Sequence, residues 1–260
     1  MKYFSNKKIL ITGAASGLGK ELALLLASYS AKLVLIDINQ EQLEHVKLTC
    51  EKNATEVQTF VVNLLDEAPL LEIRDNINLP DIIFANAGVG GVNPGFSFDN
   101  EIDSKIMGIN YHGLVKTISP FIDGFVKRKS GQICGVSSLA SMRGLPGASS
   151  YSASKAAVNN YLESIRMDLR AHNIFITTVL PGFIKTPMTD HDAFDMPLIQ
   201  TANSSAEKIL KAVSKRKRIY AFPKIMYWGT LLNRFMPSFI YDFLMTRISG
   251  QSKDLKPRIF

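Results

Sequence analysis

Residues 8–19 read KILITGAASGLG, and this stretch decides the fold. Lys8–Thr12 is an apolar run of strand length, and the glycines after it lead into a predicted helix. Glycines let the backbone turn sharply and approach a pyrophosphate, whose charge is attracted by the free amides of a helix N-terminus. In this position Gly13, Gly17 and Gly19 predict a dinucleotide-binding turn, with an ordinary tight turn as the competing interpretation.

Asp37 ends the second predicted strand, where a carboxylate can accept both hydroxyls of an adenosine ribose. A 2′-phosphate would be repelled there, and neither Ser16 nor Ile38 supplies the positive charge that an NADP site usually has. The sequence therefore predicts NAD as the cofactor and disfavours NADP. The alternative is an aspartate that caps the next helix.

Outward from this turn, short apolar runs alternate with longer helical segments, which is typical of a parallel sheet covered by helices on both faces. We predict an α/β fold, a Rossmann-like doubly wound parallel sheet of about seven strands with a helical C-terminal extension. The predicted strands are Lys8–Thr12, Lys32–Asp37, Val57–Val62, Asp81–Ala85, Gln132–Ser137, Ile174–Leu180 and Arg218–Phe222. The predicted helices are Gly17–Tyr29, Gln40–Lys52, Glu67–Asn76, Asn100–Lys127, Tyr151–Ala171 and Ser205–Lys215.

A chain of 260 residues can form one domain of this architecture. Residues 1–222 would be its dinucleotide-binding and catalytic part, and residues 223–260 an apolar and basic extension of the same domain. Ser204 and Glu207 match a capping box at the start of the last predicted helix. The stretch from Pro181 to Asn203 has the composition of a loop and is long enough to act as a lid.

The residues with the clearest chemistry follow the fourth and fifth predicted strands. Asn86-Ala87-Gly88 is small enough to let the chain pass close to a cofactor, although a plain turn is the alternative. Further on, Tyr151 and Lys155 stand at i and i+4 of a predicted helix and therefore share one face. A tyrosine with its ordinary pKa near ~10 is a poor base at neutral pH, and a neighbouring ammonium favours the phenolate. A surface pair without function is the alternative.

Together these elements resemble the short-chain dehydrogenase/reductase family, in the family's order, over residues 7–222. The family's T-G-x-x-x-G-x-G matches Thr12–Gly19, and its N-A-G matches Asn86–Gly88. Its Y-x-x-x-K matches Tyr151 and Lys155. Each motif is weak alone, and the combination is specific.

Other positions extend the resemblance. The family's active-site asparagine corresponds to Asn110 and its serine to Ser138, which the family spacing selects over the preceding serine. Its Pro-Gly pair matches Pro181-Gly182, and the threonine that holds the nicotinamide carboxamide matches Thr186. One departure is Asn63, where the family more often has aspartate, so the contact with the adenine is in question.

The resemblance implies a hydride transfer between NAD(H) and a carbonyl or secondary alcohol. Ser138 would hydrogen-bond the substrate oxygen, Tyr151 would exchange a proton with it, and Lys155 would favour the phenolate and hold the nicotinamide ribose. Asn110 would fix a water beside Lys155. The implied cofactor-binding residues are Gly13, Ser16, Gly17, Leu18, Gly19, Asp37, Asn63, Leu64, Asn86, Ala87, Gly88, Tyr151, Lys155, Pro181, Gly182, Ile184 and Thr186.

The composition excludes several classes of protein. The net charge of +7 is uneven, because Glu207–Phe260 holds 12 Lys and Arg against 3 Asp and Glu. No reading element for nucleic acid accompanies these charges, so nucleic-acid binding is not expected. Cys50, Cys134 and the histidines lack metal-ligand spacing. With the first glycine of the motif at Gly13, no cleavable signal peptide precedes it, and we expect a cytoplasmic protein.

The last fifth of the chain is rich in large apolar side chains, and three interpretations of it stay open. It could pack on its own core or on a dimer partner, contact a membrane peripherally beside its basic residues, or form a substrate lid. The stretch Ile219–Ile248 is too interrupted by charges and prolines to span a membrane. A homodimer or homotetramer is expected.

The substrate is predicted to be apolar, such as a lipid-like compound or a steroid. In the family the region after the Pro-Gly pair borders the substrate, which would place Phe183, Phe194 and Met196 at its mouth. The alternative from another functional class is a catalytically silent dinucleotide-binding protein with a regulatory or scaffold role. A missing member of the catalytic set would have favoured it, and none is missing.

Overall fold

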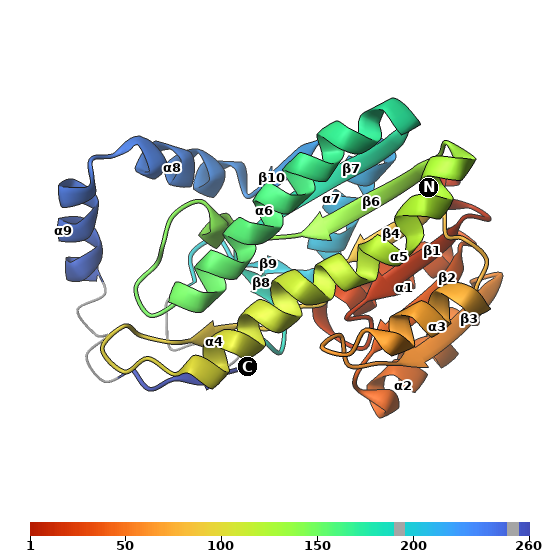
Figure 1. Ribbon diagram of the computed structural model, residues 1–260, viewed down its shortest axis with the longest axis horizontal. Coiled ribbons are helices and arrows are strands. Elements are labelled where there is room, and N and C mark those ends of the chain that lie inside the picture. The colour runs from red at the N-terminus through yellow and green to blue at the C-terminus, as the bar shows by residue number, and fades with distance from the viewer. Residues whose placement is uncertain (190–195, 249–254) are drawn as a thin grey trace.

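A computed structural model describes residues 1–189, 196–248 and 255–260. Its centre is a parallel sheet of seven strands in the order β10-β7-β6-β4-β1-β2-β3 (Figure 1). The strands are β1 (Lys8–Thr12), β2 (Lys32–Asp37), β3 (Glu56–Val61), β4 (Ile82–Ala85), β6 (Gly131–Val136), β7 (Ile174–Pro181) and β10 (Ile219–Phe222). The predicted doubly wound parallel sheet is confirmed.

Helices cover both faces of the sheet because five of its strands, β1, β2, β4, β6 and β7, contribute buried side chains to two hydrophobic cores. One core is shared with α1, α2 and α7, and the other with α3, α5 and α6. The helices are α1 (Gly17–Ser28), α2 (Gln40–Cys50), α3 (Ala68–Asn76), α4 (Asn100–Met107), α5 (Gly113–Arg128), α6 (Ser149–Leu169), α7 (Ala202–Ser214), α8 (Lys224–Phe235) and α9 (Ser238–Ile248).

The strand order reverses beside β1, and this reversal positions the site. The chain runs outward from β1 through β2 to β3, then returns to β4 on the other side of β1 and continues outward through β6, β7 and β10. The loops after β1 and β4 therefore separate toward opposite faces. In open α/β sheets the crevice formed there, at the carboxyl ends of the strands, is where ligands bind.

Among the described residues, four short strands lie outside the main sheet. β5 (Gly91–Val92) pairs antiparallel with β11 (Arg258–Ile259), and β8 (Ile184–Lys185) pairs with β9 (Gln200–Thr201). The last described residues thus return to the loop after β4. These pairings are too short to produce a sequence signal, and none was predicted.

Several predicted element boundaries are wrong. The helix predicted over Asn100–Lys127 is interrupted by a wide π-helical turn at Gly108–His112, which separates α4 from α5. The capping box of Ser204 and Glu207 is also wrong, since α7 begins at Ala202. Its N-cap is Thr201, whose Oγ1 accepts from the Ser204 amide at 3.2 Å.

The stretch Pro181–Asn203 is less irregular than predicted, because it contains β8 and β9. Phe194 lies outside the described residues. Among the residues that the structure does describe, no helix is long and apolar enough to cross a membrane. In the same part of the chain, no cluster of histidine, cysteine or acidic side chains could hold a metal ion.

Candidate active site

A cavity of about 760 Å³ opens at the carboxyl ends of β1, β2, β4, β6 and β7. Most of the sequence-predicted site residues line it: Gly13, Ser16, Gly17, Leu18, Asp37, Asn63, Leu64, Asn86, Ala87, Gly88, Ser138, Tyr151, Lys155, Pro181, Gly182, Ile184 and Thr186. Gly19 and Asn110 do not line it and stand just behind its wall. The fold therefore brings the predicted residues together from distant parts of the chain.

The glycine turn after β1 is held against the loop after β4. Gly13 has a φ of +68°, which favours glycine because a Cβ would be strained there. Thr12 Oγ1 accepts from the amides of Asn86 and Ala87, both at 3.2 Å, and Asn86 Nδ2 donates to the Thr12 carbonyl oxygen at 3.0 Å. These bonds fix the two loops that form the switch-point crevice.

The Asp37 carboxylate faces the cavity at the end of β2. Its Oδ2 accepts from the Ala15 amide at 2.9 Å, and its Oδ1 accepts from the Asn39 amide at 3.0 Å. Asn39 is the N-cap of α2, since its Oδ1 accepts from the Gln42 amide at 3.0 Å. The alternative that Asp37 is merely the cap of that helix is therefore wrong. Its placement suits the ribose hydroxyls of a dinucleotide.

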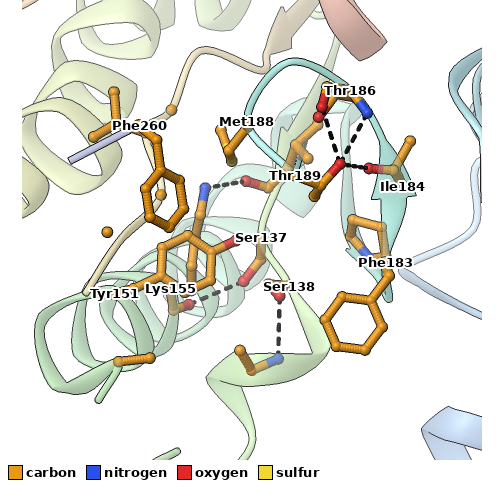
Figure 2. A pocket seen from close by; sticks show the side chains of 18 of the residues that line it. Ser137, Ser138, Tyr151, Lys155, Phe183, Ile184, Thr186, Met188, Thr189 and Phe260 are labelled. Atoms are coloured by element: carbon orange, nitrogen blue, oxygen red, sulfur yellow. Dashed lines mark hydrogen bonds between the residues drawn. The ribbon is translucent and has the colours of Figure 1, made fainter. Parts of the chain in front are cut away.

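The two serines after β6 differ in their contacts. Ser137 is buried, and its Oγ donates to the Lys155 carbonyl oxygen at 3.0 Å, which ties β6 to α6. Ser138 is half-buried, and its Oγ accepts from the Ala140 amide at 3.1 Å, which leaves its own proton for another acceptor. Figure 2 shows both side chains with Tyr151 around the cavity.

Tyr151 and Lys155 extend from the first turns of α6 into the cavity wall (Figure 2). Lys155 Nζ lies 5.8 Å from the centroid of the Tyr151 ring and donates to the Val136 carbonyl oxygen at 3.2 Å. The lysine is 4% exposed, and burial of its ammonium lowers its pKa to about 8. At pH 7 the ammonium therefore still predominates beside the tyrosine.

Asn110 lies in the π-helical turn, where a wider turn of helix is often found at functional sites. Its Oδ1 accepts from the Val89 amide at 2.8 Å, and its Nδ2 donates to the Val89 carbonyl oxygen and to Ser154 Oγ, both at 3.0 Å. A Cβ placed on Gly88 would lie 2.9 Å from Asn110 Oδ1 and 3.1 Å from Lys155 Nζ. Both polar atoms therefore face the same side of Gly88.

Comparisons with known proteins agree with this geometry. A family model described as short chain dehydrogenase matches residues 7–196. An oxidoreductase of Myxococcus xanthus (strain DK1622) is 31% identical over 252 residues, covering 95% of this chain and 100% of that protein. The chain belongs to the short-chain dehydrogenase/reductase family. The resemblance drawn from the sequence is confirmed.

Two further similarities concern members of the family with named activities. Epidermal retinol dehydrogenase 2 of Homo sapiens is 29% identical over 247 residues, covering 91% of this chain and 80% of that protein. The crystal structure of levodione reductase covers 84% of this chain and 96% of its own, with a TM-score of 0.77 and 26% identity. As a member of the family, the chain is an NAD(P)-dependent oxidoreductase that acts on alcohols or carbonyls.

The Pro-Gly segment of this oxidoreductase closes over the glycine turn. Thr186 Cγ2 would lie 3.1 Å from a Cβ placed on Gly17, so the two segments meet at this edge of the cavity. Thr189 Oγ1 accepts from the Thr186 amide at 2.9 Å and donates to the Ile184 carbonyl oxygen at 2.8 Å. Figure 2 shows this cluster beside the cavity.

The side of the cavity formed by the extension, where we expect the substrate, contains residues that sequence reasoning missed. They come from α8, α9 and the last described residues: Met226, Thr230, Asn233, Tyr241, Met245, Leu255 and Phe260. The apolar composition of the extension was a signal that it covers something. It did not indicate which side chains would face inward.

Arg143, in the loop after β6, connects this extension to the cavity wall through hydrogen bonds and an aromatic contact. Its guanidinium donates to the carbonyl oxygens of Asn233 and Met236 at the end of α8, the latter at 3.0 Å. The guanidinium carbon also lies 3.8 Å from the centroid of the Tyr241 ring, whose hydroxyl donates to the Gly144 carbonyl oxygen at 2.7 Å. A cation at a helix C-terminus is favourable, so Arg143 stabilises α8 while it binds α9.

Proposed function

We propose that this chain is an NAD(H)-dependent dehydrogenase/reductase for apolar secondary alcohols or ketones. The observation that carries the proposal is the convergence of Ser138, Tyr151 and Lys155 on one cavity that also contains the glycine turn and Asp37. When bound, the nicotinamide supplies or accepts the hydride. Residues 1–222 form the catalytic part in this proposal, and residues 223–260 complete its substrate side.

The positions of the side chains support the following catalytic roles. Ser138 donates its hydroxyl proton to the substrate oxygen and orients it. Tyr151 gives that oxygen a proton in the reductive direction and takes one in the oxidative direction. The Lys155 ammonium stabilises the phenolate and would hydrogen-bond the ribose of the nicotinamide.

Asn110 is a positioning residue in this proposal. Its amide side chain braces the Val89 backbone and Ser154, so it holds the loop after β4 against α6. Since its Oδ1 and Lys155 Nζ face the same side of Gly88, it also stands where a water could be held beside the ammonium. That water would link Lys155 to bulk solvent for proton exchange.

A preference for NAD over NADP is supported by Asp37. Its carboxylate lines the cavity next to Ile38, and it would repel a 2′-phosphate on the adenosine ribose. Asn63 also lines the cavity, and its Oδ1 accepts from the Leu65 amide at 3.1 Å. Its Nδ2 is a donor, so it suits an adenine nitrogen better than the adenine amine.

An apolar substrate is supported by the lining of the cavity beyond the cofactor residues. Leu145, Phe183, Met188, Met196 and Met226 all line it. Few charged groups face this part, so a substrate with an extended hydrocarbon part would lose little hydration that the site fails to replace. The similarity to a retinol dehydrogenase agrees with such a substrate.

The test is turnover with a panel of ketones and secondary alcohols of increasing apolar size, followed through NADH absorbance. We expect activity with NAD(H), rising with the apolar character of the substrate. The catalytically silent alternative makes a different prediction: NADH would raise the melting temperature, but no member of the panel would react. That combination would overturn the proposed function.

A second proposal concerns the outer surface of the extension, which we assign to contact with an anionic lipid surface. Ile225, Trp228, Leu232 and Phe235 recur at helical spacing along α8 and are 63% to 79% exposed. On α9, Phe239 and Phe243 are 75% and 54% exposed. Figure 1 shows both helices at one end of the molecule, with α8 continuing from the end of β10 and α9 farther from the sheet.

The charges beside these side chains favour a lipid surface as the partner. Lys224, Arg234 and Arg247 are exposed on the same two helices, against one exposed acidic residue there, Asp242. Each basic residue near an anionic membrane contributes roughly 1 kcal/mol of attraction. The opposite side of α8 lines the cavity through Met226 and Thr230, so an apolar substrate could enter from the membrane.

We propose a cytoplasmic homodimer or homotetramer with this peripheral contact.

Vesicle flotation tests the surface directly. Trp228→Glu combined with Phe235→Glu should reduce recovery with anionic vesicles at least about fivefold relative to wild type, because both apolar contact and charge attraction weaken. Phe96→Glu is the matched control, since Phe96 is 63% exposed outside the extension. Equal recovery of all three proteins would overturn the lipid contact. Loss of the oligomer in the double variant, measured by light scattering, would assign the surface to subunit packing instead.

A further inference from the structure

The last described residues form a strap across the substrate side of the cavity. β11 pairs antiparallel with β5, with Ile259 opposite Gly91. The pairing continues at Phe260, whose amide donates to the Gly90 carbonyl oxygen at 3.3 Å and whose carbonyl oxygen accepts from the Gly90 amide at 3.0 Å. The backbone thereby fixes Phe260 beside the loop that follows β4.

The ring of Phe260 packs on the backbone of that loop. A Cβ placed on Gly90 would lie 2.8 Å from Cε2 and 3.0 Å from Cδ2 of the ring, and 3.1 Å from Cγ of Met188. The ring and Met188 therefore both contact the bare backbone at Gly90, where a larger residue would collide with them. Since Met188 follows the Pro-Gly pair, Phe260 and Met188 together close the space between the loops after β4 and β7.

Phe260 and Tyr151 line the same cavity, and Figure 2 shows both rings in its wall. In the proposed function the reacting carbon must lie beside the Tyr151 hydroxyl. The part of the substrate that extends toward β5 then meets the Phe260 ring. We infer that Phe260 sets the size of the substrate group that fits beside Tyr151. This inference rests on the proposed function, because it takes Tyr151 as the proton donor.

A purely structural role for the ring makes a different prediction. If Phe260 only anchored β11, its removal would lower the melting temperature and weaken the binding of every ligand alike. A ring that limits size changes the ratio between large and small ligands. Packed apolar sites discriminate strongly by size, since even one methylene is worth about tenfold or more in specificity.

The experiment compares the wild type with Phe260→Ala in the presence of saturating NAD⁺. A ketone cannot be reduced by NAD⁺, so its affinity is measured by calorimetry without turnover. The probes are cyclohexanone and 2-decalone, which differ by one fused ring. Phe260→Ala should shift the affinity ratio by about tenfold toward 2-decalone. Phe96→Ala, the same change at an exposed site outside the cavity lining, should leave the ratio unchanged.

Phe260→Leu is a second variant in case Phe260→Ala misfolds. It should shift the affinity ratio in the same direction by a smaller factor. An unchanged ratio in both variants would overturn the inference, as would failure of both ketones to bind the wild type and the variants. Reduction of the same ketones by NADH separates the two proposals. A shifted affinity ratio without turnover would contradict the proposed function and reduce the inference to a limit on the size of the ligands that bind beside Phe260. Turnover with an unchanged ratio would contradict only the size role.

Discussion

The two sides of the cavity differ in how deeply the elements that form them are buried. β1 and β4 lie in the middle of the sheet, and all of β4 and most of β1 are buried. By contrast, none of the residues of α8, all of which the structure describes, is fully buried. Among the described side chains after Phe222, Tyr241 is the one that is buried.

We expect this difference to separate cofactor binding and catalysis from substrate binding. In the proposed function, the side of the cavity that would hold the cofactor and the catalytic side chains, the core side, depends on the core, so its geometry is as stable as the fold itself. The substrate side depends on Arg143, on Tyr241 and on a two-residue ladder between β5 and β11. Substitutions on the first side should change turnover, cofactor choice and global stability. Substitutions on the second should change substrate binding and leave cofactor binding nearly unaltered.

The largest expected effect is that of Tyr151→Phe, which removes the transferable proton and keeps the ring. We expect kcat to fall by about 10²–10⁴-fold, the usual contribution of general acid–base catalysis. The affinity for NADH, measured by fluorescence titration, should change little. Activity within about tenfold of wild type would remove Tyr151 from its proposed role.

The buried ammonium of Lys155 should lower the free energy of unfolding of the protein. Its pKa is about 8 in the folded protein against the ordinary 10.5, so between these values the unfolded chain binds more protons and stability rises with pH. The shift corresponds to a destabilisation on the order of 3 kcal/mol at pH 7. Lys155→Met should therefore be inactive yet more stable than wild type in urea at pH 7.

The pH dependence provides the control for this prediction. The stability advantage of Lys155→Met should shrink as the pH rises from 8 toward 10, because the wild-type lysine then folds without losing a charge. Lys20→Met, on an exposed position of α1, controls for the change of side chain. An advantage that stays constant over this range would show that packing, and not the buried charge, causes it.

Asp37→Ala tests cofactor choice on the core side. Loss of a charged acceptor for the ribose hydroxyls should lower kcat/KM with NADH by about 10–100-fold, since a hydrogen bond to a charged group contributes about 1.5–3 kcal/mol. The same change should raise kcat/KM with NADPH, because it removes the repulsion of the 2′-phosphate. Steady-state kinetics with both cofactors decide this. A wild type that already prefers NADPH would contradict the assignment to NAD.

The core side was largely predictable from the sequence because its signals are local. The glycine turn begins directly at the end of β1, and Asp37 ends β2, so a motif and its element appear within a few residues of each other. Tyr151 and Lys155 lie on one helix face, and their spacing alone placed them together. The π-helical turn at Gly108–His112 was missed, since the apolar spacing continues through it.

The substrate side could not be predicted for the opposite reason. The pairing of Gly91 with Ile259 joins two residues far apart in the chain, and each strand has two residues, which gives no alternating pattern. In α8, apolar side chains occupy both the cavity side, as with Met226, and the exposed side, as with Trp228. Composition therefore indicated an apolar covering, but periodicity could not assign its faces.

Arg143→Ala should have the smallest of these effects, and it tests the substrate side alone. The change removes the hydrogen bonds to the end of α8 and the contact with the Tyr241 ring, so α8 and α9 should hold the cavity wall less firmly. We expect KM for a ketone to rise by about three- to tenfold, in keeping with about 1 kcal/mol from the lost hydrogen bonds. The affinity for NADH and the protein's response to Asp37→Ala should stay the same. Arg143→Lys, which keeps the charge but cannot reproduce the planar fork, should recover part of the loss. A fall in NADH affinity on Arg143→Ala would mean that the extension also orders the cofactor side, and the separation of the two sides would fail.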